Sequence, residues 1–593
     1  MQGWSLFRRG AVTAVVALGV GGLGGLTAAA DDPPVPPTPP AISVSYQGVP
    51  IADCLEQTVC PQVMPLGESV AVTVAATSGD VVSVRYGFSG QLPVDVDGST
   101  VSVTMAPPHE GWATLEARSI NAIGQFSSPA YFMFNVGPRP AAVGSWGFDE
   151  GTGTTAADGP GLTHPLTLGG GAALDAKGRI DGSLALDGVD GTARATAPVI
   201  DTSKSFSMSA WVRPTNAATT GVVAAVTGTR TTAAGLGYDA GTKRWTFART
   251  SADVNLPAVS KVSSKEAPVN GAWAHLLGTY DAATGQLQLF VNGRLQQTAQ
   301  SAVGWQAAGP LTVGRGKSAG TPTGAFAGSV DRLAVWQRVL VADEIPPLVD
   351  PRVGGGGNDR ITAGLAAYWP LDDAVRTNGT SRTPEQVRGA DLTLTGFAKP
   401  AGAFVDDPEL GRVLELTGRS QESLSLNAST VDGSASFTVA ARVKIDDPSK
   451  PMVVARQGTA GKDTWRLEYR PVDTFTSQWR FIRGDAGSAT ETVAVASIDH
   501  DSLPGWHLLA GSYNANLANG TPRLELTVDN RPSDGSIVPY QATPPRAGTT
   551  VVGTGRTSGQ AFDGRIDDLR VYAGLAASFR LCADYPGTEG CGA

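Results

Sequence analysis

The chain has 593 residues, a formal net charge of −9 and only 17% charged residues. Its length is too great for one hydrophobic core and predicts three or four domains. Its 74 Gly and 40 Pro residues indicate an all-β protein of strands joined by tight turns. No dense run of Lys and Arg is present to neutralise phosphates, which argues against nucleic acid as a partner.

The first 30 residues are typical of a secretory signal peptide. Positive charge at Arg8 and Arg9 precedes an uncharged apolar stretch over residues 10–26, and three alanines at residues 28–30 supply a cleavage site. An uncleaved membrane anchor is the alternative, because the apolar stretch is near the lower limit of a membrane span. We predict a secreted, extracellular protein without a transmembrane segment in its mature chain, either free or associated with the cell surface.

A small β-sandwich is predicted after the signal peptide. Residues 31–40 are rich in proline and predict an extended linker. Residues 41–137 contain short segments of alternating apolar and polar residues, such as 69–74, separated by Gly, Asp or Pro. The runs 111–118 and 130–136 resemble the last strands of immunoglobulin-like or fibronectin-III-like modules.

The four cysteines fall into two pairs that are close in sequence. Cys54 lies near Cys60, and Cys582 lies near Cys591. In an oxidising compartment such pairs close small loops, so we predict two local disulfides. A zinc site would need closer spacing and neighbouring histidines. Residues 576–593 are therefore expected to form a disulfide-closed C-terminal tail.

An internal repeat with a period of about 230 residues occupies the rest of the chain and indicates duplication of a whole domain. We predict domains at 141–350 and 361–575, joined by a Gly-rich linker at 351–360. The blocks that recur in the same order are 145–149 and 368–372, 184–188 and 414–418, 205–210 and 436–441, 273–281 and 506–514, 287–293 and 524–530, and 326–336 and 562–572.

These blocks resemble those of laminin-G-like jelly rolls, which are concanavalin A-like β-sandwiches. The resemblance rests on the opening Trp-Gly-Phe-Asp of residues 146–149, the Trp-x-His block of 273–281 and the closing block of 326–336. It implies two tandem jelly rolls beside the smaller N-terminal sandwich. Alternation over 287–291, followed by Asn-Gly at 292–293, agrees with a half-buried strand that ends in a hairpin turn.

The sequence offers little support for catalysis. Jelly-roll glycoside hydrolases carry Glu-x-Asp-x-x-Glu on one strand, and no such run occurs. The resemblance therefore implies a non-catalytic secreted protein that binds carbohydrate or a surface or matrix protein. A glycan-processing enzyme with an unrecognised site and a structural cell-surface component are the alternatives. None of the five histidines lies in a nucleophile-elbow or metalloprotease pattern, and these are His109, His164, His275, His500 and His507.

Calcium is the cofactor that the resemblance suggests for the first copy, because related sandwiches hold Ca²⁺ at a rim through Asp side chains and carbonyl oxygens. Asp187 and Asp190 share a Gly-rich turn, and Asp331 is expected to approach from the closing block. The alternative is that the first two aspartates only cap the turn. The second copy has Thr417 and Arg419 in this turn and is not expected to bind the ion.

Aromatic side chains could bind sugar rings. Trp305 lies in a turn-rich segment between strands and is predicted to be an exposed ligand platform. Arg442 in the second copy occupies the place of Trp211 in the first, a difference that the sequence does not explain. The tryptophans of the strand blocks are predicted to be buried or half-buried, and these are Trp146, Trp211, Trp273, Trp336, Trp369 and Trp506.

Overall fold

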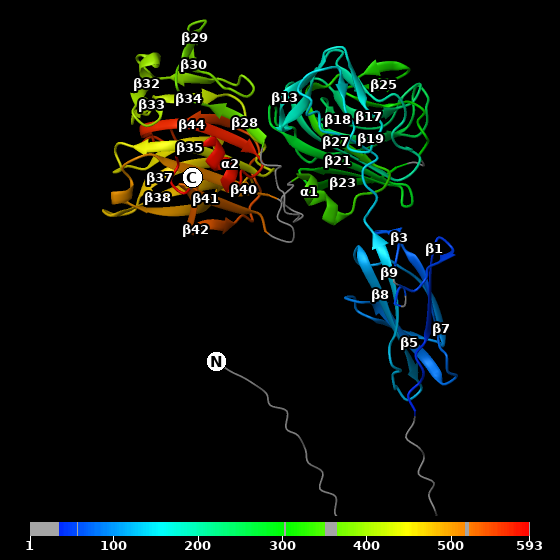
Figure 1. Cartoon of the computed structure of the whole chain (residues 1–593). Coiled ribbons are helices and arrows are strands. Elements are labelled where there is room, and N and C mark those ends of the chain that lie inside the picture. Colours follow the sequence, from blue (N-terminus) through cyan, green and yellow to red (C-terminus); the bar gives the residue numbers. More distant parts are fainter. Residues whose placement is uncertain are drawn as a thin grey trace, which may run out of the picture. The chain divides into compact units, whose positions relative to one another are not determined.

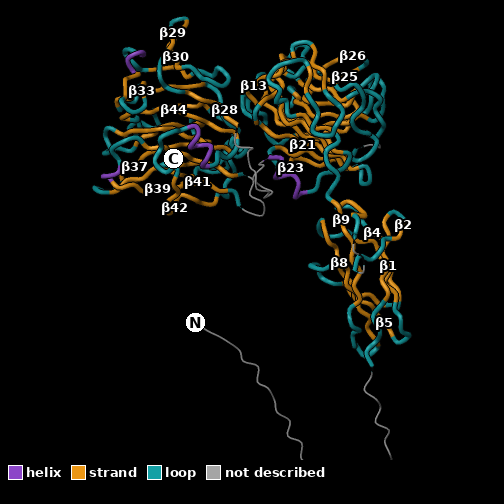
Figure 2. Tube along the Cα trace, viewed as in Figure 1, coloured by secondary structure: helices purple, strands orange, loops and turns teal. Residues whose placement is uncertain are grey.

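The computed structural model describes residues 35–55, 57, 59–301, 304–349, 364–515 and 521–591. The predicted signal peptide and Gly-rich linker lie outside these residues. The chain forms two compact units, residues 1–140 and 141–593 (Figure 1). Strands dominate both units, which confirms the predicted all-β class (Figure 2). No helix of the described ranges is long and apolar enough to cross a membrane.

The first unit is a sandwich of two β-sheets. Alternation buries Val70, Val72 and Val74 of one sheet against Leu115 and Phe134 of the other. The assignment of this sandwich as immunoglobulin-like stays a prediction. The smaller sheet has the order β2 (Val49–Pro50), β1 (Ala41–Tyr46), β4 (Val70–Ala75) and β7 (Thr100–Met105). The larger sheet has the order β3 (Gln62–Pro65), β9 (Ala130–Gly137), β8 (Gly111–Asn121), β5 (Val81–Phe88) and β6 (Val94–Asp97).

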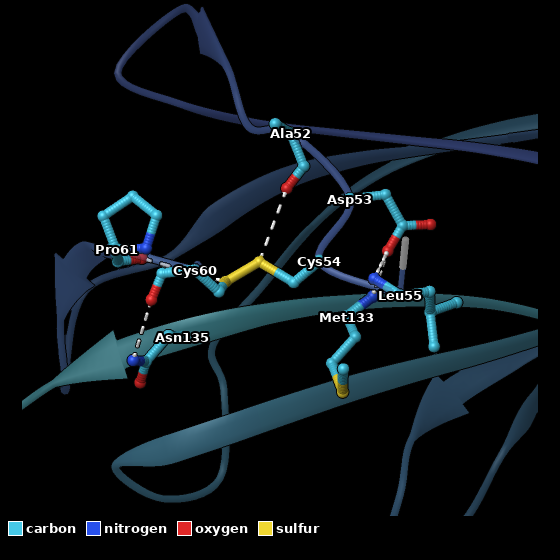
Figure 3. The surroundings of a disulfide bond; sticks show 8 residues. All are labelled: Ala52, Asp53, Cys54, Leu55, Cys60, Pro61, Met133 and Asn135. Carbon is cyan, nitrogen blue, oxygen red and sulfur yellow. Dashed lines mark hydrogen bonds between the residues drawn. A yellow bond between two sulfur atoms is a disulfide. The ribbon is translucent and has the colours of Figure 1, made fainter. Parts of the chain in front are cut away.

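The predicted disulfide between Cys54 and Cys60 is present in the loop that precedes β3 (Figure 3). This loop is held against β9. The Asp53 carboxylate accepts a hydrogen bond from the backbone N–H of Met133 at 3.0 Å, and the Asn135 side chain donates to the Cys60 carbonyl at 3.3 Å (Figure 3). The disulfide and these hydrogen bonds therefore fix the chain where β3 joins the larger sheet.

Residues 141–349 form a jelly roll, here called copy 1, with two eight-stranded sheets. Sheet I has the order β13 (Ala172–Ile180), β14 (Gly182–Asp187), β27 (Ala327–Trp336), β16 (Phe206–Pro214), β21 (Ala274–Asp281), β22 (Gln286–Val291) and β23 (Arg294–Gln300), with β10 (Gly144–Trp146) paired to β27. Sheet II has the order β11 (Thr155–Ala156), β12 (Leu166–Gly169), β15 (Thr192–Arg194), β24 (Leu311–Val313), β17 (Gly221–Thr227), β18 (Thr232–Asp239), β19 (Arg244–Thr250) and β20 (Val259–Ser263). The remaining elements are β25 (Gly316–Ser318), β26 (Thr321–Thr323), η1 (Ala342–Glu344) and α1 (Ile345–Val349).

Residues 364–591 form the second jelly roll, copy 2, with sheets of eight and nine strands. Its sheet I has the order β32 (Phe404–Asp407), β33 (Gly411–Thr417), β44 (Asp563–Ala573), β35 (Phe437–Ile445), β40 (His507–Asn514), β41 (Arg523–Val528) and β42 (Arg531–Pro539), with β28 (Gly364–Trp369) paired to β44. Its sheet II has the order β29 (Val375–Thr377), β30 (Thr380–Thr383), β31 (Leu392–Thr395), β34 (Ser423–Leu426), β43 (Thr549–Val552), β36 (Met452–Gly458), β37 (Asp463–Pro471), β38 (Thr476–Gly484) and β39 (Glu491–Asp499). The helical elements are η2 (Pro400–Ala403), η3 (His500–Ser502) and α2 (Ser578–Asp584).

The repeated sequence blocks occupy equivalent places in the two copies. The opening blocks form β10 and β28, and each pairs with the closing strand of its own copy. Trp146 and Trp369 of these strands are fully buried, and each indole N–H donates to a backbone carbonyl, of His164 at 2.9 Å and of Ala390 at 3.0 Å. The duplicated sequence therefore builds the same hydrogen-bonded tryptophan into each core.

Trp211 and Trp273 are buried, as predicted, but they do not lie between the sheets of copy 1. Both stand on the outward face of sheet I, and they pack with Val349 against Ala366 and Ala573 of copy 2. The second unit thus contains a further apolar cluster, at the junction of its two jelly rolls. Burying these indoles explains why the unit is compact across both copies.

Arg442 stands where copy 1 has Trp211 because a different segment covers this face in copy 2. Helix α2 lies over the outward face of sheet I (Figure 1), and the fully buried Tyr585 packs there with Ala440 and Leu508. Arg442 donates to the carbonyl of Pro586 and lies 3.6 Å from the Asp568 carboxylate. The second predicted disulfide, between Cys582 and Cys591, closes this tail. A cation therefore suits the position in copy 2, because the Pro586 carbonyl and the Asp568 carboxylate lie beside it.

Replacing Trp211 by Ala should destabilise the second unit strongly, because it leaves a cavity at the junction. We expect the free energy of unfolding in urea to fall by about 3–5 kcal/mol. Phe475→Ala is the matched control, since that ring is 78% exposed. A loss in Trp211→Ala no larger than in the control would contradict burial at the junction.

Candidate functional site

The structure keeps only two of the three predicted calcium ligands together. Asp187 accepts backbone hydrogen bonds from Val189 and Gly191, each at 2.9 Å, and these lower its pKa. Asp190 lies in the same turn and accepts from Gly171 at 2.8 Å. Both aspartates therefore cap the turn. Within the described ranges, no group of three or more His, Cys, Asp or Glu side chains is arranged to hold a metal ion.

Asp331 does not approach the other two aspartates. Asp187 pairs across the sheet with Ala327, four residues earlier on β27, a separation of about 13 Å along the strand. The Asp331 side chain is fully buried, and one of its oxygens accepts from the backbone N–H of Ile180 at 2.8 Å. The expected approach of Asp331 to the turn is therefore wrong, because the strand register places it farther along.

Trp305 is not the exposed platform that the sequence predicted. Its ring is half-buried against the core of copy 1, and its indole N–H donates to the Thr250 carbonyl at 3.0 Å. Its own carbonyl accepts from the Thr202 hydroxyl at 2.6 Å. The turn-rich segment is thus folded back onto the sandwich, which hydrophobic packing of the indole favours. A ligand role for Trp305 stays a prediction.

The outward face of sheet II carries small side chains in copy 1. Ala225, Gly235 and Ala248 lie side by side across β17, β18 and β19. Their neighbours along the strands, Leu236 and Phe247, point into the core. The centre of this face therefore consists of backbone and small residues.

The equivalent face of copy 2 carries charged side chains. The register places Arg456, Arg466 and Ile482 side by side across β36, β37 and β38. Arg466 forms ion pairs with Glu468 at 2.8 Å and with Glu491 at 3.0 Å. The two jelly rolls therefore present different side chains on the outward face of sheet II, although equivalent strands form that face in both.

These carboxylates do not have the properties of a glycosidase acid. Burial alone would raise the pKa of Glu491, but its hydrogen bonds and charge interaction with Arg466 outweigh burial and lower it. A general acid at neutral pH needs a raised pKa. Glu468 is also engaged, because it pairs with Arg480 at 2.7 Å. The charged face of copy 2 is therefore best described as a structural ion-pair network.

The carboxylic acids with strongly raised pKa values lie where solvent does not reach them. Burial raises the pKa of Asp331 to about 7 and that of Asp567, its equivalent in copy 2, to about 8. Asp331 is 0% exposed and Asp567 is 4% exposed. Each comes directly before an irregularity in its closing strand, where the next residue, Arg332 or Asp568, has a left-handed backbone and the register shifts. We interpret both as structural acids.

A pocket of about 550 Å³ opens between the two copies, and we call it the junction pocket. Copy 1 supplies β22, β23 and the segment after β20. Copy 2 supplies the loop before β43 and the residue Ser434. The apolar part of its wall consists of Val291, Leu295, Pro544 and Pro545, and the polar part includes Lys265, Glu266, Arg294, Gln296 and Arg546.

Three hydrogen bonds across the junction fix the walls of this pocket. Asn292 donates to the Ser434 hydroxyl at 2.8 Å, and Arg294 donates to the Tyr513 hydroxyl at 3.3 Å. Arg546 donates to the Ala267 carbonyl at 3.0 Å. These bonds join the β22–β23 hairpin and the Ala267 loop of copy 1 to strand β40 and two loops of copy 2. The pocket is therefore shaped by both jelly rolls together.

A buried ion pair lies behind the pocket. Arg546 binds the fully buried carboxylate of Asp432, with one N–O distance of 3.0 Å. Burial alone would lower the pKa of Arg546, but the Asp432 carboxylate outweighs it and raises that pKa. Both groups therefore stay charged and keep the loop in place. The side chains of Lys265 and Glu266, in contrast, are exposed and form no hydrogen bond or ion pair with other described residues.

The sequence blocks match a known family model. The model described as the concanavalin A-like lectin/glucanases superfamily matches residues 187–346 and 418–576, which together make up more than half of the chain. The chain belongs to this superfamily. The predicted resemblance is thereby confirmed for both copies of the superfamily domain, and no curated protein matches the chain.

Solved structures of several other proteins resemble parts of this superfamily member. Domain 4 of an extracellular GH43 arabinanase from Geobacillus stearothermophilus, in complex with arabinotriose, is 19% identical with a TM-score of 0.28 and covers 34% of this chain and 96% of its own. The binding domain of botulinum neurotoxin serotype G is 10% identical with a TM-score of 0.33 and covers 74% and 99%. A heptameric pentraxin from Limulus polyphemus is 15% identical with a TM-score of 0.21 and covers 24% and 68%.

The junction pocket was not foreseen from the sequence of this superfamily member. Its residues come from a hairpin and the segment after β20 in copy 1, and from loops of copy 2 that are more than a hundred residues away. No motif links Leu295 to Pro545. The exposure of Leu295, at 44%, next to a buried Val291 is the one local signal, and it is visible only after folding.

Asp331→Asn should change how the stability of copy 1 depends on pH. The pKa of Asp331 rises from 3.8 to about 7 on folding, so the folded state binds the extra proton and stability falls as pH rises through this range. The penalty above pH 7 is about 4 kcal/mol at most. Urea unfolding at pH 5 and pH 8 should show that the free energy of unfolding falls with pH in the wild type and that Asp331→Asn removes this fall.

The control for this prediction is Asp406→Asn, since the Asp406 side chain is 89% exposed. It should leave the difference between the two pH values unchanged. A wild-type-like pH dependence in Asp331→Asn would show that the buried carboxyl does not hold the extra proton.

Proposed function

We propose that this chain is a secreted, non-catalytic carbohydrate-binding protein and that the junction pocket is its binding site in the second unit. Membership of the lectin-containing superfamily gives the general class. The observation that carries the proposal is a pocket of about 550 Å³ with an apolar wall and two charged side chains that form no hydrogen bond or ion pair with other described residues. Ligand pockets are usually of this size and often lie at domain interfaces.

The wall of the pocket suits the two kinds of surface that a sugar presents. Leu295, Pro544 and Pro545 offer apolar contact to the C–H groups of a ring. Lys265 donates and Glu266 accepts, so together they match a pair of neighbouring hydroxyl groups. Neither side chain has to break a hydrogen bond with another described residue to bind. The opposite charges of Lys265 and Glu266 cancel, so these two groups together favour an uncharged ligand.

The fixed geometry of the pocket supports binding at low entropic cost. Arg294 and Arg546 are held by bonds across the junction, and Asp432 keeps Arg546 charged and in place. A site whose walls are already ordered loses less freedom on binding than a mobile loop does. The junction pocket thus has an advantage over the charged face of copy 2, where a ligand would have to compete with the ion pairs of Arg466.

Two features support an extracellular location. Both predicted disulfides are formed, and disulfides persist in oxidising compartments. The expected signal peptide would deliver the chain there. A surface or matrix protein as the partner, a structural role and an unrecognised enzyme are the remaining possibilities that the binding experiment separates.

Leu295→Arg should abolish oligosaccharide binding by the second unit, because the longer charged side chain fills the junction pocket. The measurement is a neutral glycan array on the full chain, followed by calorimetric titration with the best ligand. We expect affinity to fall at least 10-fold, which corresponds to about 1.4 kcal/mol. Lys265→Ala should give a smaller fall, since it removes one donor.

Leu256→Arg is the matched control, since it makes the same change at a leucine that is 94% exposed and outside the pocket. Unchanged binding in Leu295→Arg, or equal loss in Leu256→Arg, would place the site elsewhere. Release of reducing sugar from any array glycan would favour the enzyme.

Calcium in the turn of Asp187 and Asp190 is a second and narrower proposal, now without Asp331. The two carboxylates share one turn, and each has one oxygen for which the described residues provide no hydrogen-bond partner. A bound ion would raise the melting temperature, because it binds the folded state only. We expect a lower melting temperature in EDTA than in Ca²⁺ for wild type and no difference for Asp187→Asn. An identical wild-type melt in both buffers would refute calcium binding.

A further inference from the structure

A second pocket lies in the first unit, on the outward face of the larger sheet. It has a volume of about 400 Å³ and is bounded by Arg85, Pro93, Glu116, Arg118 and Phe126. The register shows why the hollow exists. Gly87 of β5 lies opposite Glu116 of β8, so the outward position between Arg85 and Ser89 has no side chain. We call this hollow the module pocket.

Two ordered ion pairs stand at the rim of the module pocket. Arg85 makes a two-pronged contact with Asp95, at 2.5 and 2.7 Å, and its guanidinium lies 4.7 Å from the centre of the Phe126 ring. The hydrogen bond from Arg85 lowers the pKa of Asp95, so the pair stays charged. Arg118 donates through Nε to one oxygen of Glu116 at 2.8 Å. Cation–ring stacking and paired charges thus order the rim before any ligand arrives.

Several hydrogen-bonding atoms at this rim are unused. The two terminal nitrogens of Arg118 and the second oxygen of Glu116 form no hydrogen bond with the other described residues of the unit. The guanidinium edge donates and the carboxylate oxygen accepts, so together they match neighbouring hydroxyl groups. The alternative is that the Arg118–Glu116 pair only makes the surface soluble. That role does not require a pocket beside the pair.

One exposed aromatic side chain, Phe126, lines the hollow, and two more lie on the same face of the sheet outside it. Phe126 is 40% exposed, and Tyr131 is 45% exposed on β9, directly opposite Glu116. Trp112, four residues before Glu116 on the same face of β8, is 53% exposed, about 13 Å along the strand. Rings beside paired charges are well suited to bind the C–H faces and hydroxyl groups of a sugar chain.

From this geometry we infer that the first unit carries its own carbohydrate site, in the module pocket, for a short neutral oligosaccharide. The charges of the two rim pairs sum to zero, which favours an uncharged ligand. The inference is independent of the junction pocket, because the two sites share no residue. With both sites active, one chain would bind two positions on a polysaccharide, and linkage of the two would raise its overall affinity.

The experiment uses the full chain carrying Leu295→Arg, so that the junction pocket is blocked. Neutral oligosaccharides of glucose, galactose, mannose, xylose or arabinose are titrated into it by calorimetry. At least one should bind, and Phe126→Ala and Arg118→Ala should each weaken it about 10-fold or more, the value of one charge-assisted hydrogen bond or ring contact.

Val49→Ala is the control, because this residue is 67% exposed and lies on the opposite sheet of the same unit. Circular dichroism of each variant verifies that the first unit stays folded. Binding that survives both pocket variants would overturn the inference, and so would the absence of binding by every neutral oligosaccharide. The junction pocket is tested separately, in a chain that carries Leu295→Arg alone. Unchanged oligosaccharide binding in that variant would contradict the junction pocket and not the module pocket.

Discussion

The outward face of sheet I in each jelly roll is apolar and has to be covered. Copy 1 places Trp211 and Trp273 on this face, and copy 2 places Leu508 and Ala510 there. Apolar surface left in water costs about 25 cal/mol per Å². Each copy therefore carries two hydrophobic surfaces, one between its sheets and one outside them. The second surface dictates how the unit is assembled.

The two copies meet this requirement in different ways. Copy 1 is covered by Val349 of its own helix α1 and by Ala366 and Ala573 of copy 2. Copy 2 is covered by the C-terminal tail, whose Tyr585 donates to the carbonyl of Ala440 at 2.9 Å. The junction pocket is a consequence, because the contact that buries the indoles also brings the hairpins of copy 1 against the loops of copy 2. Duplication of one fold has thus produced a site that a single copy could not form.

The duplicated framework also tolerates different chemistry where packing does not constrain it. Ala225 and Gly235 on sheet II of copy 1 correspond to Arg456 and Arg466 in copy 2. By contrast, the buried aspartate before the irregularity of the closing strand is present in both. Its carboxyl supports an irregular backbone: in copy 1 it accepts the N–H of Ile180. Backbone groups that lose their ladder partner need such a substitute.

The sequence by itself determined the all-β class, the two jelly rolls and the two disulfides, because alternation, turn residues and short cysteine spacings are local signals. Trp146 and Trp369 were foreseen as buried for the same reason. Only the tertiary structure decided that Trp211 lies at a junction, that Asp331 stays away from Asp187, and that Leu295 and Pro545 line one pocket. Strand register and contact between distant segments set these facts. No local pattern encodes them, since each depends on which surface another part of the chain covers.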